Sequence, residues 1–188
     1  MNQHLEYYQH IKALEDKIGF NFSNPMIFYQ ACTHRSYQNE MRNLSTNNER
    51  LEFLGDSVLS VVVSDFLYSN FPDFVEGELS FAKSKLVEAS ACANYAKDLE
   101  IDSFLLLGKG EMQNLGKGRE SVIADFFEAI IGAIFIDSGM TVVRNFLLEK
   151  FSKRWLDMGL KKEDNEKVLL QEYSQKKFQT IPEYHVIS

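Results

Sequence analysis

Cysteine and proline are scarce in this chain of 188 residues, which contains two cysteines and three prolines. Cys32 and Cys92 stand in apolar stretches and lack the spacing of a metal site, which argues against a disulfide scaffold or a cysteine-based metal module. We interpret both as reduced core thiols with no catalytic role. Residues 1–17 lack an apolar segment long enough for a secretion signal. We therefore expect a cytoplasmic protein.

Long hydrophobic runs are also missing. No run reaches membrane-spanning length, so we expect no membrane partner. Hydrophobic residues nevertheless make up 45% of the chain and include 15 phenylalanines. This composition is sufficient for the core of one main domain, with room for an appendage.

A nucleotide-binding loop is absent, and we expect no small-molecule cofactor. The Gly-rich stretch of residues 108–119 has the wrong glycine spacing for a P-loop, and neither Ser nor Thr follows Lys117. Its basic residues, Lys109, Lys117 and Arg119, are candidates for phosphate contact. An ordinary surface loop is an equally good interpretation.

Positive charge is in deficit. The formal net charge is −7, and the acidic excess lies in residues 1–148. Such a balance ordinarily argues against a nucleic-acid partner. If several carboxylates converge on metal ions, however, the cations cancel local charge and can themselves meet phosphate. The charge is therefore compatible with a phosphodiester substrate but does not predict one.

The hydrophobic pattern is helical nearly throughout, which predicts an all-α fold. We expect helices over residues 5–17, 25–32, 49–70, 76–99, 121–137 and 142–158. Asn24 should cap the second helix, a capping box from Thr46 to Glu49 should open the third, and Gly139 should end the fifth.

The composition changes after Gly159. Residues 159–166 are charged and lack apolar periodicity, which indicates a linker. Beyond it we expect a helix over residues 167–177 and a strand over residues 182–187. One helix and one strand cannot build a core, so residues 167–188 are interpreted as the start of an incomplete second domain.

Two strongly apolar helices carry acidic residues on one face each. On a helical wheel Glu52 and Asp56 lie within about 40° of each other, with Glu49 beside them, and Asp125 and Glu128 lie about 60° apart. We expect neither helix to have an ordinary solvent-facing side. A buried carboxylate needs a cation or strong donors, and a divalent metal shared by both helices satisfies that need.

The metal and the chemistry follow from these ligands. Mg²⁺, for which Mn²⁺ can substitute, prefers carboxylate and phosphate oxygens. Metal ions at such a site generate a hydroxide nucleophile and stabilise a leaving oxygen, which predicts phosphodiester hydrolysis. The alternative is that the acids are solvated or paired with Lys and Arg. That interpretation is favoured for any single acid, whereas the joint arrangement favours the metal.

His34 is a second candidate. It stands in the segment Thr33-His34-Arg35-Ser36. No Ser or Cys nucleophile has an interpretable relation to it, so a structural histidine is favoured over a catalytic one.

The segment from Glu49 to Leu59 resembles, almost residue for residue, the defining motif of the ribonuclease III family. The resemblance extends over residues 5–158, with matching stretches at 33–37, 76–80, 108–111 and 123–133. Residues 167–173 look like the start of that family's double-stranded RNA-binding domain. The resemblance implies an all-α ribonuclease III endonuclease domain over residues 1–158, a linker over 159–166 and the N-terminal fragment of an α/β RNA-binding domain over 167–188.

The resemblance implies a Mg²⁺-dependent homodimeric endoribonuclease that cuts double-stranded RNA and leaves 5′-phosphates and 3′-hydroxyls, with roles in rRNA and mRNA processing. Its metal-binding catalytic carboxylates would be Glu52, Asp56, Asp125 and Glu128. Glu49 and Glu76 match two further acids of the catalytic valley, with Glu76 contributed across the dimer.

The resemblance also assigns contacts outside the acidic group. Phe53 matches an aromatic that inserts into a socket on the partner subunit. Gln171, Glu172 and Gln175 match residues that contact the RNA minor groove.

Two other functions remain open. The first is a noncatalytic RNA-binding or ribosome-associated module on the same fold. Such relatives usually lose catalytic acids, whereas this chain keeps all of them. The second is a structural helical dimer that binds no RNA.

Overall fold

The computed structural model describes residues 11–41, 44–114, 118–159, 173–175, 177–180 and 182. Residues 11–18 are helical. The further elements are α2 (Pro25–Cys32), α3 (Arg35–Glu40), α4 (Glu49–Asn70), α5 (Glu76–Val87), α6 (Ala89–Asp98), η1 (Asp102–Phe104), α7 (Lys109–Asn114) and α8 (Arg119–Gly159). Within the described residues there is no strand, only an isolated parallel bridge between Thr33 and Leu106. The predicted helical fold is confirmed for this part of the chain.

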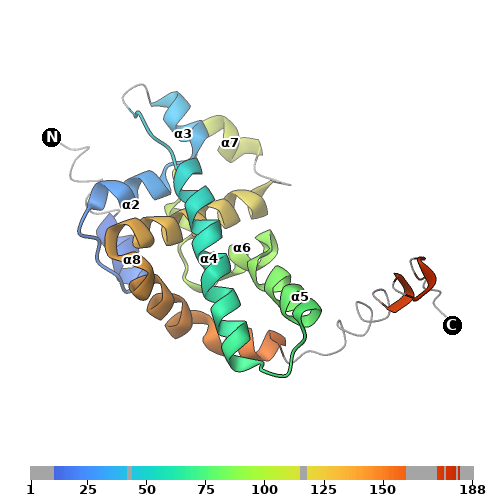
Figure 1. Cartoon of the computed structure of the whole chain (residues 1–188). Coiled ribbons are helices and arrows are strands. Elements are labelled where there is room, and N and C mark those ends of the chain that lie inside the picture. The colour runs from blue at the N-terminus through green and yellow to red at the C-terminus, as the bar shows by residue number, and fades with distance from the viewer. Residues whose placement is uncertain are drawn as a thin grey trace.

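Helix α4 runs through the middle of the molecule, and α8 packs against it more extensively than against any other helix (Figure 1). Helix α6 also packs on α8, and α5 packs on α4. The centre is formed by apolar side chains such as Leu59, Val63, Phe126 and Ile130, all with 0% exposure. Each such side chain stabilises the fold by roughly 1.5–3 kcal/mol relative to exposure.

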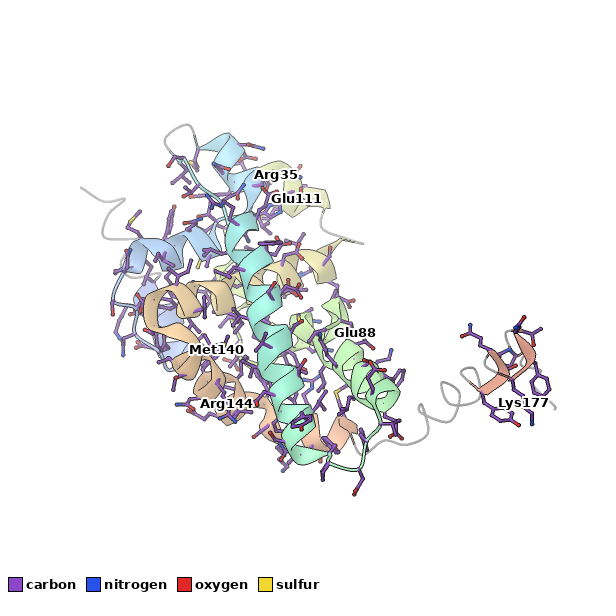
Figure 2. The ribbon with its side chains drawn as sticks, viewed as in Figure 1. Arg35, Glu88, Glu111, Met140, Arg144 and Lys177 are labelled. Carbon is purple, nitrogen blue, oxygen red and sulfur yellow. The ribbon has the colours of Figure 1, made fainter. Side chains whose placement is uncertain are left out.

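Polar contacts tie the middle of α8 to α4 and to the residues before α2. Arg144 of α8 pairs with Asp65 of α4 at 3.0 Å (Figure 2). The Asp137 carboxylate accepts hydrogen bonds from the backbone N–H groups of Ser23 and Asn24. These contacts hold α8 in register along α4 and beside the start of α2.

The predicted bounds of α2 and α4 are confirmed. Of the two caps predicted for these helices, only that of α2 is confirmed. Asn24 accepts from the Met26 N–H, as expected for the cap of α2. At α4 the capping box is wrong: the Asn47 side chain accepts from the Glu49 N–H at 3.1 Å, and Asn48 makes no side-chain cap. An Asn side chain readily bonds the backbone two residues onward.

The single helix predicted for residues 76–99 is wrong, because the chain breaks at Glu88, which has extended backbone (ψ 155°). Its carboxylate accepts from the Ser90 hydroxyl at 2.7 Å, a local contact that competes with helical bonding. The break leaves carbonyls of the last turn of α5 without helical partners. The hydroxyl of Tyr95 donates to one of them, that of Leu86, at 3.0 Å.

The structure also differs from the prediction in two connections between helices. The predicted loop over residues 108–119 contains the short helix α7. Helix α8 covers both helices predicted for residues 121–158, and Gly139 (φ 80°, ψ 177°) kinks it between them. Only glycine adopts this backbone conformation readily. Gly139 therefore separates the two helical segments as predicted, although the chain continues directly from one to the other.

The expectation that no segment reaches membrane-spanning length is wrong for α8. By length and composition alone, residues 119–158 qualify as one span. Half of the qualifying stretch is buried within the structure, against α4 and α6 among other helices. A buried core helix meets the same criterion, because its apolar residues face neighbouring helices.

Most of the predicted linker and second domain lies outside the described residues. Residues 173–175 and 177–178 are helical, and the Lys177 ammonium lies over the rings of Tyr173 and Phe178. Of the predicted strand only Pro182 is described, and it belongs to no element. The domain boundaries therefore stay predictions.

Candidate metal centre

Two glycines let α4 and α8 approach closely. A Cβ atom at Gly55 would overlap the carbonyl oxygen of Glu128, and one at Gly132 would overlap the carbonyl oxygen of Leu51. Backbone therefore packs directly on backbone at this crossing. Gly55 follows Glu52 by one turn and Gly132 follows Glu128 by one turn, so the crossing brings the acidic turns of the two helices together.

Three of the four predicted metal ligands meet at this crossing. Glu52, Asp125 and Glu128 each offer a carboxylate oxygen, and these oxygens lie within 4.8 Å of one another. All three side chains are partly buried. Hard oxygen donors at this spacing suit Mg²⁺ or Mn²⁺, which bind through a few carboxylates and keep room for water and phosphate. The donor set therefore fits the predicted metal.

Asp56, the fourth predicted ligand, is exposed on α4 and is not part of this closest group. It is still near: its charge contributes to the raised pKa of Glu128 and of Glu52. The structure thus places Asp56 beside the centre rather than within the three-carboxylate group.

Among the described residues, burial and mutual repulsion outweigh the positive charge near these carboxylates. Burial, followed by the charges of Asp56 and Asp125, raises the pKa of Glu128 to about 8. Burial and then the charges of Asp125, Glu49 and Asp56 raise the pKa of Glu52. In the absence of a cation, Glu128 therefore keeps its proton at neutral pH. A divalent ion would relieve the same repulsion.

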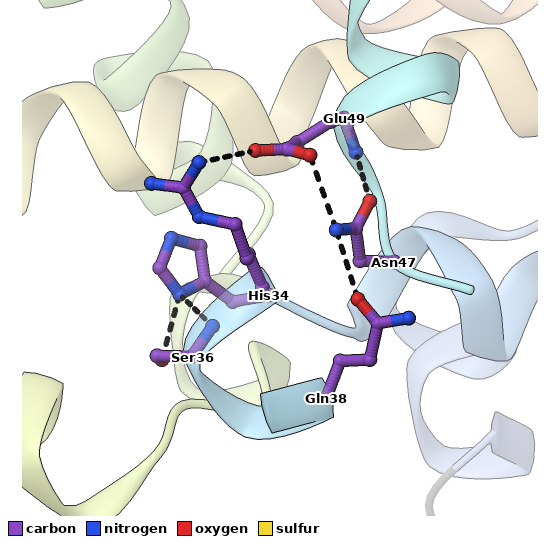
Figure 3. A network of polar contacts seen from close by, with 6 residues as sticks. His34, Ser36, Gln38, Asn47 and Glu49 are labelled. Carbon is purple, nitrogen blue, oxygen red and sulfur yellow. Dashed lines mark hydrogen bonds and ion pairs between the residues drawn. The ribbon is translucent and has the colours of Figure 1, made fainter. Parts of the chain in front are cut away.

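His34 has the structural role that the sequence favoured. It also lies near the metal group, which the sequence did not suggest. Its Nδ1 accepts from the Ser36 N–H at 3.2 Å and caps α3 (Figure 3). The Ser36 hydroxyl oxygen accepts from the Gly108 N–H. Since Nδ1 is an acceptor, the neutral ring carries its proton on Nε2. Burial raises the pKa of Asp125, and a positive charge on His34 would oppose that rise, so the imidazole lies within electrostatic reach of the metal group.

Glu49 lies in a polar network at the start of α4 (Figure 3). Its carboxylate pairs with Arg35 at 3.1 Å and accepts from the Asn47 amide at 3.1 Å. The same amide nitrogen lies 3.0 Å from the Gln38 side-chain oxygen. Glu49 is therefore held by α3 and stands next to the metal group rather than in it.

Glu76 is separate from the metal group within this chain. It is exposed at the start of α5, where its carboxylate accepts from the Ser80 hydroxyl at 2.8 Å. The role assigned to it across a dimer stays a prediction.

The expectation that neither acidic helix has a solvent-facing side is wrong for α4. Phe53, Val61 and Tyr68 are exposed along it, with exposures of 78%, 56% and 76%. They form an interrupted apolar stripe, because the exposed Ser57 and Ser64 lie between them. The other helices cover only part of the α4 surface, so residues on the remaining part face outward. The exposure of Phe53 agrees with a surface role, and its insertion into a partner stays a prediction.

The predicted RNA contacts are dispersed or lie outside the described residues. Lys109 is exposed at the start of α7, and Arg119 pairs with Asp102 at 3.7 Å. Gln175 is exposed and helical. Lys117, Gln171 and Glu172 lie outside the described part of the chain. These assignments stay predictions.

Sequence reasoning missed the pairing of Gly55 with Gly132 and the position of Cys92. The sequence did contain a signal for the glycines, since each stands in an apolar helix where glycine is unfavourable. Cys92 lies on α6, and its Sγ is 3.7 Å from the Glu128 carboxylate. No feature of the sequence relates two residues 36 positions apart on different helices.

Comparisons with known proteins agree with this geometry. Residues 24–155 match the family described as Ribonuclease-III-like. Ribonuclease 3 of Protochlamydia amoebophila is 47% identical over 175 residues, covering 93% of this chain and 72% of that protein. Ribonuclease 3 of Borreliella burgdorferi is 41% identical over 175 residues, covering 92% and 71%.

Solved structures support the same assignment. The nuclease domain of ribonuclease III from Campylobacter jejuni, described as flexible in a region involved in dimer formation, is 36% identical, with a TM-score of 0.69 over 76% of this chain and 96% of that one. Dicer from Pichia stipitis, at 23% identity and a TM-score of 0.57 over 89% of this chain and 75% of that one, shares the fold. The chain therefore belongs to the ribonuclease III family of endoribonucleases.

Proposed function

We propose that this chain hydrolyses phosphodiester bonds of double-stranded RNA with Mg²⁺, leaving 5′-phosphate and 3′-hydroxyl ends, and that it acts in rRNA and mRNA processing in the cytoplasm. The observation that carries the proposal is the convergence of Glu52, Asp125 and Glu128 on one point between α4 and α8. Two buried, free cysteines are consistent with a reducing compartment.

The residues that would hold the metal are Glu52, Asp125 and Glu128, with Asp56 beside them. When bound, a divalent ion lowers the pKa of a water molecule and neutralises phosphate charge. The carboxylates supply the negative charge and the oxygen donors. The close crossing at Gly55 and Gly132 holds the two helices in place, so that the donors are arranged before the ion arrives.

The fold also supports a duplex substrate and a homodimer. A-form RNA presents its phosphates and 2′-hydroxyls across a wide minor groove, so an enzyme can recognise the duplex by its shape. The exposed Phe53, Val61 and Tyr68 of the α4 stripe offer apolar contacts to a partner subunit. A two-fold dimer would place two equivalent sites against two strands that are themselves two-fold related.

The test compares Glu128→Gln and Asp56→Asn with the wild type on a long RNA duplex in Mg²⁺. We expect cleavage to fall by several orders of magnitude while duplex binding persists, because these changes remove metal ligands and leave phosphate contacts. Glu149→Gln is the matched control, since Glu149 is exposed and pairs with the adjacent Lys150. Unchanged cleavage by both acidic variants would contradict the proposal, whereas a wild type that binds duplex without cutting it would indicate a noncatalytic RNA-binding module.

We further propose that residues 1–158 form the endonuclease domain, residues 159–166 a linker and residues 167–188 the start of a double-stranded RNA-binding domain. Attaching a complete second domain to the chain should tighten duplex binding. It should leave the rate at which the bound complex cleaves RNA unchanged. Binding at several salt concentrations and single-turnover cleavage measure the two quantities separately. Equal affinity of the two forms would contradict the domain assignment.

A further inference from the structure

One side chain from outside the two acidic helices contacts the metal group. Cys92 lies in the first turn of α6, is fully buried, and places its Sγ 3.7 Å from Oε1 of Glu128. A thiol is protonated at neutral pH and is a weak donor, and a carboxylate is an acceptor. Cys92 therefore donates from α6 to the carboxylate with the most strongly raised pKa in the group.

The break between α5 and α6 sets the position of this thiol. The Sγ of Cys92 also lies 3.7 Å from the carbonyl oxygen of Val87, the last residue of α5. That carbonyl stands in a final helical turn, where backbone oxygens lack helical partners. One thiol proton thus has two acceptors. When a bound cation holds Glu128 in its ionised form, the carboxylate is the stronger acceptor, because hydrogen bonds to charged groups are stronger than those to neutral ones.

A donor behind a metal-binding carboxylate restrains its orientation. A bond from Cys92 to Oε1 limits rotation of the Glu128 carboxylate and leaves the second oxygen available. Such outer partners, which hydrogen-bond a metal ligand without binding the metal themselves, orient the ligand and tune metal affinity. Ordinary core packing by a small side chain would not require a donor, and this difference makes the role testable.

We propose that Cys92 is a positioning residue, whose thiol orients the Glu128 carboxylate for binding a divalent cation. The inference rests on the proposed function, since the orientation of Glu128 matters only if it binds the metal. It assigns a role in the nuclease site to α6, a helix that contributes none of the acidic ligands.

The test is a Mn²⁺ binding isotherm, measured by calorimetry without RNA, for the wild type, Cys92→Ser and Cys92→Val. Serine keeps a donor, whereas valine fills a similar space without one. We expect valine to weaken Mn²⁺ binding by roughly 3- to 10-fold, below the 10- to 100-fold common for outer partners because a thiol is a weak donor. Serine should stay within about two-fold of the wild type, since its hydroxyl is also a donor.

Cys32→Val is the matched control, because Cys32 is also a fully buried, unpaired thiol and lies on α2. It should leave Mn²⁺ affinity unchanged, and thermal melting should confirm that each variant is folded. A valine variant at position 92 that binds like the wild type, or a serine variant that binds as weakly as valine, would overturn the role of Cys92 alone. A wild type that binds no Mn²⁺ would overturn both this inference and the proposed function.

A kinetic measurement separates positioning from general damage. In single-turnover cleavage of a duplex, Cys92→Val should raise the Mg²⁺ concentration needed for half-maximal rate. The rate at saturating Mg²⁺ should stay within about two-fold of the wild type, because outer partners act through the metal ligands. A lower maximal rate with an unchanged Mg²⁺ midpoint would contradict the positioning role.

Discussion

Gly55 of α4 lies directly against the carbonyl oxygen of Glu128 on α8, with no space for a methyl group between them. Gly132 has the same relation to the carbonyl oxygen of Leu51. The spacing of the two acidic helices is therefore set by backbone contact. The position of the carboxylates at the crossing depends on that spacing.

The first prediction is that Gly55→Ala and Gly132→Ala each destabilise the fold by about 1–3 kcal/mol, the usual cost of overpacking. Both should also weaken Mn²⁺ binding, since the helices must move apart. Urea unfolding and calorimetry measure the two effects. Gly110→Ala is the control, because a Cβ there meets nothing within 4 Å. Wild-type stability in both crossing variants would contradict the tight contact.

The second prediction concerns pH in the metal-free protein. Glu128 has a pKa of about 8 in the fold against an ordinary 4.5, so the folded state binds the proton more tightly than the unfolded state does. Its contribution is fully present below the ordinary pKa and is lost as pH rises through about 8. The free energy of unfolding should therefore fall as pH rises from 4.5 to about 8. Glu128→Gln should flatten that decline in urea titrations at several pH values, and an unchanged slope would contradict the assignment.

The third prediction is that metal addition and removal change stability. Mn²⁺ should raise the melting temperature, because it binds the folded group of carboxylates and not the unfolded chain. The gain is about 2.7 kcal/mol at 100 times Kd. EDTA should reverse it, and Glu52→Gln should reduce it. A melting temperature insensitive to Mn²⁺ would count against the metal centre, whereas Glu149→Gln should respond like the wild type.

The fourth prediction is that Phe53→Ala shifts the protein toward monomer in sedimentation experiments. Phe53 is 78% exposed on α4, so it is available for contact with a partner subunit. Met26→Ala changes an exposed apolar residue on α2 and should leave the assembly unchanged. The same sedimentation profile for both variants would contradict the dimer assignment of Phe53.

The fifth prediction is that Ser36→Ala costs about 1–2 kcal/mol, because the Gly108 N–H and the ring of His34 both lose a partner. The loss should loosen α3 from the segment leading into α7. Ser84→Ala is the control, since that exposed hydroxyl bonds only its own helix. Hydrogen exchange around residues 106–112 would detect the loosening, and equal effects of the two changes would contradict it.

Local rules predicted most of the helix limits but not the breaks between helices. The N-terminal cap and the bounds of α2, the bounds of α4 and the kink at Gly139 follow from properties of single residues and their neighbours. The break at Glu88 was not predicted: the contact between Glu88 and Ser90 is local, but a partner for the freed Leu86 carbonyl comes only from Tyr95, once α6 has packed beside α5. Likewise, the sequence did not indicate which apolar residues of α4 would stay exposed.

The sequence alone determined the family, the acidic residues and the chemistry that they allow, because neither a motif nor the donor atoms of a carboxylate depend on how the helices pack. Only the tertiary structure decided how the acids divide: Glu52, Asp125 and Glu128 meet, Asp56 stands beside them, and Glu49 is held by Arg35. It also decided that Cys92 reaches Glu128. These relations depend on the angle and spacing at which separate helices cross, and two glycines set that spacing through backbone contact.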